Sequence, residues 1–257
     1  MTTETTRAEP VELGVPWPHR QAMVLAEEAY DRFVDVLAHV DDDDWQRPTD
    51  CVGWSVRDLA GHVVGAMRSA ASVRELARQQ REAARRTKAQ GGQLVDHLTT
   101  RQIEVTADLS TAALVAEARR LVPRATAGRR RTPAPLRRLV RIPVEVHDLA
   151  ETWPLGYFVD VILTRDAWLH RIDLCRALDR APELTPDHDG RIVADVVDEW
   201  GRRHGRPFHL VLTGPAGGAF GDPAVDALEL DAVEFCRIVS GRATGTGHPL
   251  LATEVPF

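Results

Sequence analysis

The chain has 257 residues, 44% of them hydrophobic, so it is long enough for one or two domains with a full core. Its net charge of −6 disfavours nucleic-acid binding through bulk charge. It has no apolar run long enough for a transmembrane helix, and residues 1–10 do not resemble a signal peptide. The three cysteines, Cys51, Cys175 and Cys236, lie far apart and indicate reduced thiols. Together these features predict a cytoplasmic protein without membrane or nucleic-acid partners.

Four amphipathic segments in the first two thirds of the sequence predict a helical bundle. Apolar residues recur at helical spacing in residues 19–40, 55–89, 109–122 and 157–178. Ser55 and Asp58 form a capping-box-like start for the second segment. In a four-helix bundle, metal sites are commonly built at core positions on facing helices.

The basic stretch 124–141 between the third and fourth segments has two interpretations. It contains several arginines and is interrupted by prolines. An exposed connection is the simpler interpretation, and an anion-attracting flap beside a functional site is the alternative. The run of acids at 41–44 lacks the alternation and glycine of a calcium loop, so we expect solvated charge there.

The sequence beyond Pro182 predicts a small α/β unit. Helical patterns at 186–204 and 231–240 flank two short β-rich runs, at 208–212 and 228–230. We therefore expect a mainly α chain with two domains, a four-helix bundle at 15–182 and an α/β domain at 183–257.

Asp166 and His170 are the strongest candidates for a functional site. Four residues apart on one helix, their side chains would lie on the same face and could grip one divalent cation. His62, in the second turn of the second helix, is the best candidate for a third ligand. Two histidines and one carboxylate would leave a coordination position open, as in catalytic metal sites. A surface ion pair or a hydrogen-bonded core histidine would explain the same spacing.

Three segments resemble the mycothiol-dependent maleylpyruvate isomerase family of actinobacterial DinB-like proteins. They are residues 48–63, the run from Asp166 to Asp173, and the tail 231–242. The resemblance implies a DinB-type four-helix bundle with a smaller α/β lobe. It also implies a divalent metal, typically zinc, held by His62, Asp166 and His170. Asp166 departs from the glutamate expected at that position, which weakens transfer of the exact substrate more than transfer of the metal.

The resemblance also implies a chemistry. The metal would activate the thiol of mycothiol for addition to an electrophilic small molecule, as in maleylpyruvate isomerisation. A mycothiol S-transferase, or a non-catalytic metal- or ligand-binding protein, is the alternative. The chain would act as a monomer or homodimer, and no side chain is assigned a catalytic role.

Smaller expectations concern residues near these motifs. Arg237 and Arg242 could bind the sugar-bearing thiol or an anionic substrate, or could be solvated charges at a helix end. Arg171 and Asp173 could orient the metal ligands, or form ordinary ion pairs. Trp168 should pack in the core, on the side of the helix opposite the ligands. Cys51 lies in a turn near His62, without a local signature of an activated nucleophile.

Overall fold

The computed structural model describes residues 16–146, 149–245 and 247–257. The stretch 1–10 and position 15, the predicted start of the first domain, lie outside these residues. The helices are α1 (His19–Leu37), α2 (Val56–Ala71), α3 (Val73–Gln90), α4 (Leu94–Glu104), α5 (Thr111–Arg130), α6 (Ala134–Leu139), α7 (Leu155–Tyr157), α8 (Leu163–Ala177), α9 (Arg191–His204) and α10 (Ala232–Val239). The strands are β1 (Arg141–Val146), β2 (Leu149–Pro154), β3 (His209–Thr213), β4 (Gly218–Gly221) and β5 (Ala227–Asp231). Within the described ranges, no helix is long and apolar enough to cross a membrane.

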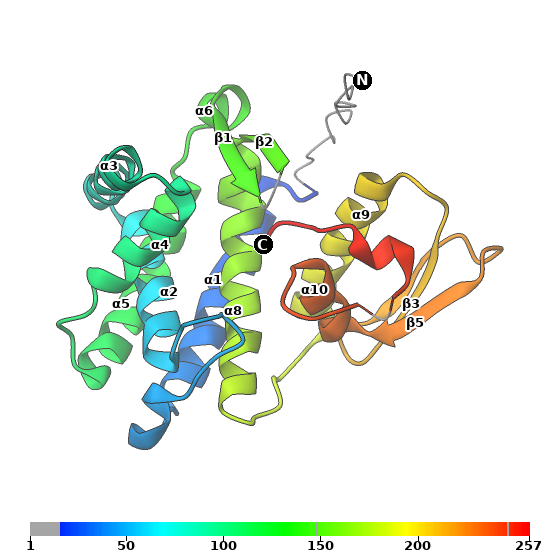
Figure 1. Cartoon of the computed structure of the whole chain (residues 1–257), viewed down its shortest axis with the longest axis horizontal. Coiled ribbons are helices and arrows are strands. Elements are labelled where there is room, and N and C mark those ends of the chain that lie inside the picture. Colours follow the sequence, from blue (N-terminus) through cyan, green and yellow to red (C-terminus); the bar gives the residue numbers. More distant parts are fainter. Residues whose placement is uncertain (1–15, 147–148, 246) are drawn as a thin grey trace.

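Helices α1, α2, α5 and α8 form the predicted bundle. Helix α2 packs against α5, α5 against α1, α1 against α8, and α8 returns to α2. Their apolar stripes meet in one core, in which Phe33, Leu59 and Leu114 are fully buried. The small α/β lobe follows the bundle, so the predicted fold class is confirmed (Figure 1).

Helix α8 contributes to two hydrophobic cores. Ala167 and Leu174 lie in the bundle core, whereas Trp168, Leu169 and Ile172 lie in a second core with the residues of α9 and α10. Figure 1 shows α8 between the other bundle helices and the C-terminal lobe. The expected core packing of Trp168 is confirmed, since its side chain is fully buried against the lobe.

The lobe is built on a three-stranded sheet of order β4-β3-β5. Strand β3 pairs with β4 in antiparallel and with β5 in parallel orientation. The structure confirms β3, β5 and the two helices of the predicted α/β unit. Strand β4 was not predicted, because its sequence Gly-Ala-Phe-Gly has little β-propensity of its own.

The prediction of a single helix over residues 55–89 is wrong, since the helix is interrupted at Ser72. Ser72 has an extended backbone and ends α2, and its hydroxyl accepts the Glu75 N–H to begin α3. Helix α3 then forms a hairpin with α4, which packs back on α2. Glycines allow this contact, because a Cβ on Gly65 would lie 2.3 Å from the carbonyl oxygen of Gln102.

The prediction of an exposed connection over residues 124–141 is also wrong for residues 124–130. Helix α5 continues through Pro123 to Arg130, and only then do α6 and the β1–β2 hairpin follow. The Arg129 side chain is buried and donates to the hydroxyl of Tyr30, the carbonyl of Val159 and the hydroxyl of Thr164. Arg129 therefore joins three bundle segments and does not belong to an anion-attracting flap.

Gly128 is required where α5 crosses α2. A Cβ at this position would lie 1.9 Å from the carbonyl oxygen of Ala70. We expect Gly128→Ala to lower the free energy of unfolding by about 2 kcal/mol, because the helices must move apart. Gly190→Ala is the matched control, since its backbone is helical and its nearest neighbour lies 3.7 Å from a Cβ. Urea denaturation of both variants checks this, and equal stability of the two would contradict it.

His188 makes stability depend on pH. Its ring is fully buried, 3.5 Å from the Glu28 carboxylate, and burial lowers its pKa to about 4 despite Asp189 and Glu28 nearby. In the unfolded chain the ring takes up its proton near pH 6.5, so stability falls as pH decreases from 6.5 towards 4. The contribution between pH 7 and pH 5 is about 2 kcal/mol. Chemical denaturation at both pH values should show a smaller pH effect for His188→Gln than for the unsubstituted chain, and an equal effect would refute the assignment.

Candidate metal centre

A tight loop before α2 forms one wall of the site. Pro48 and Ser55 pair as an isolated antiparallel bridge, and Gly53 adopts the positive φ that the turn between them requires. The Ser55 and Asp58 side chains then cap α2 reciprocally, which confirms the predicted capping box. This loop places Cys51 and Trp54 beside α8.

Helices α2 and α8 bring together His62, Asp166 and His170, as predicted. The three donor atoms lie within 4.8 Å of one another. Oδ1 of Asp166 is 3.5 Å from Nε2 of His62 and 3.4 Å from Nε2 of His170. Both histidines are buried, and the Asp166 side chain is partly exposed. The shorter aspartate thus reaches both rings from the position where the family resemblance leads us to expect glutamate.

These separations fit ligands of a metal better than partners in hydrogen bonds. Good N–H···O hydrogen bonds span roughly 2.7–3.2 Å, and both contacts of Asp166 are longer. Ligand atoms around a tetrahedral zinc ion, at about 2.05 Å from it, would be about 3.3 Å apart. Two imidazole nitrogens and one carboxylate oxygen are also a common donor set for zinc. The three residues can therefore hold a divalent ion with a further coordination position free.

Asp173 fixes the orientation of the His170 ring. The His170 Nδ1 lies 3.1 Å from Oδ2 of the fully buried Asp173. An ionised carboxylate only accepts hydrogen bonds, so Nδ1 carries the proton and Nε2 of the neutral ring keeps its lone pair. Arg242 of the C-terminal lobe donates from Nε to the same Oδ2 at 2.9 Å. Asp173 is therefore placed to orient the His170 ring, and Arg242 is hydrogen-bonded to the same carboxylate oxygen.

The electrostatics of the triad favour a cation between these groups. Burial acts to raise the pKa of the Asp166 carboxyl, but His170 and His62 hold that pKa well below its usual range. Burial likewise acts to lower the pKa of His170, and the nearby Asp166 and Asp173 raise it above its usual value instead. Asp166 therefore favours positive charge on the histidine side, and a divalent ion can supply that charge in place of a proton.

Asp173→Ala is expected to weaken zinc binding by about 10- to 100-fold without changing the stoichiometry at saturation. The substitution removes the hydrogen bond that holds the His170 ring, and leaves the three ligand side chains in place. Competition titration against a chromophoric chelator measures the change. An unchanged zinc affinity would mean that packing alone positions the ring.

Cys51, His170 and Asp173 form a second group of possible metal donors. Their donor atoms also lie within 4.8 Å of one another. The Cys51 Sγ is 3.4 Å from Oδ2 of Asp173 and 3.8 Å from Nδ1 of His170. Oδ2 of Asp173, the oxygen that faces Cys51 and His170, already accepts hydrogen bonds from His170 and Arg242. We therefore favour His62, Asp166 and His170 as the metal ligands, with Cys51 lining the centre.

Sequence reasoning missed the part that Trp54 plays. Its ring lies 5.1 Å from the ring of His62 and 5.9 Å from that of His170, centroid to centroid. It therefore forms an apolar wall against both histidines. One signal was available, since Trp54 directly precedes the Ser55 cap of the helix that carries His62.

The remaining predicted residues differ in their relation to the centre. Arg242 reaches it through Asp173, and Arg237 is buried and pairs with Asp50 at 3.0 Å. Both arginines thus connect the lobe to the bundle beside the site, so they are not solvated helix-end charges. Arg171 contacts the buried Asp189 instead, and therefore does not orient the metal ligands.

Residues 26–175 match the family model described as the mycothiol maleylpyruvate isomerase N-terminal domain. The crystal structure of the mycothiol-dependent maleylpyruvate isomerase is similar in fold, with a TM-score of 0.53 and 18% sequence identity. A histidine-to-alanine mutant of that enzyme has the same TM-score at 17% identity. In both cases the similarity covers 89% of this chain and 91% of the other.

No functionally curated protein is significantly similar in sequence. The family match nevertheless covers more than half of the chain, from within α1 to near the end of α8, and includes His62, Asp166 and His170. This chain therefore belongs to the mycothiol maleylpyruvate isomerase N-terminal domain family.

Proposed function

We propose that this protein is a divalent-metal-dependent enzyme that uses mycothiol to transform an electrophilic small molecule, in the manner of maleylpyruvate isomerase. The observation that carries the proposal is the convergence of the His62 and His170 Nε2 atoms on Oδ1 of Asp166. Membership of the mycothiol maleylpyruvate isomerase N-terminal domain family supports mycothiol as the thiol. The donor set, two nitrogens and one oxygen, favours zinc.

The chemistry of the site would be thiol activation. A divalent ion held by His62, Asp166 and His170 would lower the pKa of a thiol at its open position, so that the thiol reacts as a thiolate near neutral pH. Trp54 covers both histidine rings and limits the access of water to them. Asp173 keeps the His170 proton on Nδ1.

Isomerisation by this route conserves all atoms. The thiolate adds to one carbon of an electron-poor double bond, the electron pair of the broken π bond moves onto the conjugated carbonyl group, and the single bond that remains can rotate. Return of that electron pair then eliminates the thiolate, which restores the double bond in the opposite geometry and regenerates the thiolate for another cycle. An electrophile whose adduct cannot eliminate the thiol would leave the site as a thioether, which is the outcome of an S-transferase.

A polar hollow beside the centre suits the sugar portion of the thiol. It has a volume of about 630 Å³ and is lined by the 47–50 loop and the end of α8, including Arg47, Asp50 and Arg176. Arg176 lies six residues beyond His170, which is roughly 9 Å along the helix. Arg237 pairs with Asp50 at the edge of this hollow. The guanidinium group of Arg237 and the carboxylate of Asp50 can both form hydrogen bonds with sugar hydroxyls.

The test is thiol-dependent turnover by zinc-loaded protein. Maleylpyruvate should be consumed only when mycothiol is present, and His170→Ala should abolish the reaction. Product analysis separates the chemistries, since a released isomer supports the proposal and a stable thioether would assign an S-transferase. Tight metal binding without any thiol-dependent turnover of maleylpyruvate or of a panel of activated alkenes would instead indicate a non-catalytic binding protein.

A further inference from the structure

The α3–α4 hairpin carries a positive net charge, whereas the net charge of the whole chain is negative. Helix α3 contains a seven-residue repeat, Arg-Glu-x-Ala-Arg, that begins at Arg74 and again at Arg81. Seven residues are almost two helical turns, so the repeated arginines recur on one face. Helices α3 and α4 together hold seven Arg and Lys against four Asp and Glu, a net charge of +3, whereas the whole chain carries −6.

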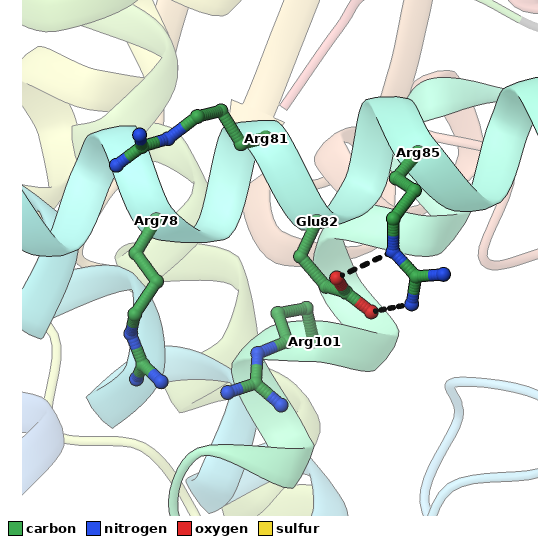
Figure 2. Close-up of a pocket in the computed structure, with 5 residues that line it drawn as sticks. All are labelled: Arg78, Arg81, Glu82, Arg85 and Arg101. Atoms are coloured by element: carbon green, nitrogen blue, oxygen red, sulfur yellow. Dashed lines mark hydrogen bonds and ion pairs between the residues drawn. The ribbon is translucent and has the colours of Figure 1, made fainter.

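Four arginines of this hairpin line an open hollow of about 470 Å³. Arg78, Arg81 and Arg85 come from α3 and Arg101 from α4, and Glu82 is the single acidic residue in the lining. Figure 2 shows the guanidinium groups of Arg78 and Arg101 pointing the same way, one from each helix. The hollow is therefore a place where guanidinium groups from two helices face one space.

The carboxylates of the hairpin do not neutralise these arginines. Glu75 pairs with Arg78 and Glu82 with Arg85, while Arg86 shares Glu82 and Glu104, and Glu104 also accepts from Arg101. Three carboxylates thus pair with four guanidinium cations, and Arg81 has no carboxylate partner among the described residues. Hydrogen bonds from Arg85 and Arg86 hold the pKa of Glu82 at about 2, so this carboxylate stays ionised and engaged by those two arginines.

Two of the lining arginines keep donors free for a ligand. Within the described part of the chain, Arg81 donates only to the carbonyl oxygen of Ala77, at 2.9 Å. Arg101 donates from Nη1 to Glu104 at 3.0 Å, and its Nη2 has no acceptor among the described residues. Guanidinium groups bind phosphate oxygens through paired hydrogen bonds, which makes arginine clusters selective for this class of anion.

We propose that the hollow between α3 and α4 binds a compact anion that carries several phosphate groups. Its volume lies within the range of small-ligand sites, roughly 300–1,000 Å³. A compact ligand is favoured over a nucleic acid because the rest of the chain is strongly acidic and would repel a long polyanion. The site is separate from the metal centre, since none of its lining residues contributes to that centre.

Calorimetric titration of the full chain with tripolyphosphate tests the proposal. We expect saturable one-to-one binding that weakens when chloride is raised. Arg81→Gln and Arg101→Gln should each lower the affinity about tenfold, as loss of a charge-assisted hydrogen bond does. Arg138→Gln, on an exposed arginine of α6, is the matched control and should leave the affinity unchanged. Any removal of metal by tripolyphosphate is common to all variants, because each keeps His62, Asp166 and His170.

Three results would overturn the proposal. Heats that do not saturate would mean that the arginines form only an ion-pair network with their glutamates. Equal weakening by Arg138→Gln and Arg81→Gln would mean diffuse attraction to the whole basic surface. Tighter binding of a single-stranded oligonucleotide than of tripolyphosphate, also lost in Arg81→Gln, would assign the site to a polymer.

Discussion

Replacing His170 with alanine is expected to abolish stoichiometric binding of zinc while the chain stays folded. His62 and Asp166 alone would offer two ligands, and the loss in affinity should exceed the 10- to 100-fold typical for a residue that merely orients a ligand. The fold should survive because the bundle core lies in apolar residues beside the site. Elemental analysis of protein prepared in zinc-containing buffer measures the bound metal, and circular dichroism checks the fold.

His39→Ala is the matched control for this experiment. His39 is exposed just after α1, and within the described structure its side chain hydrogen-bonds only to the backbone carbonyl of Asp35. It should keep one metal ion per chain. Zinc uptake should also become tighter as pH rises, because the metal must displace the proton from His170, whose pKa is raised. Full metal content in His170→Ala would remove the ligand assignment.

The second large effect is expected for Arg165, which sits in a buried ionic cluster between α8 and the lobe. Its side chain is 1% exposed and donates to Asp195 at 2.6 Å, to Glu199 at 2.8 Å and to the carbonyl of Pro256 at 3.1 Å. Arg165→Met keeps much of the volume but leaves two buried carboxylates without this cation. We expect a loss of about 3–5 kcal/mol in the free energy of unfolding.

The pH dependence of the Arg165→Met variant identifies the cause of its instability. Burial already raises the pKa of Asp195, and without Arg165 the pKa of Glu199 should rise as well. Carboxylates with raised pKa values in the folded state are neutralised as pH falls, so the defect should be smaller at pH 5 than at pH 8. Urea denaturation at both pH values measures this. Arg206→Met, on an exposed arginine after α9, should be near neutral, and a pH-independent defect in Arg165→Met would point to lost packing instead.

The candidate site could be predicted because its elements are local. The Asp166–His170 spacing places both side chains on one helical face, and the Ser55 cap fixes the phase of the helix that carries His62. That these two helices face each other could not be derived from spacing, and it came from the family resemblance. The contacts of Trp54 and Cys51 with α8 could not be derived from the sequence, since loop residues approach α8 only after the tertiary fold is formed.

The prediction of the fold failed at the ends of two helices, once at a cap signature and once where tertiary contacts outweighed a local preference. Ser72 and Glu75 form a Ser-x-x-Glu cap signature, so the break between α2 and α3 was present in the sequence. Pro123 predicts the end of a helix, yet α5 continues beyond it, because Val122, Ala125 and Arg129 are buried in the bundle. In that helix, packing outweighed the local preference of proline.

Because α8 packs on both the bundle and the lobe, the bundle is not expected to fold stably without the C-terminal lobe. Deleting the lobe would expose Trp168, Leu169 and Ile172 to water and would leave Arg165 without Asp195 and Glu199. It would also remove Arg242, the residue that holds Asp173 against His170. A truncated bundle should therefore aggregate, and exchange of lobes between relatives should succeed only when the α8 face is transferred with them.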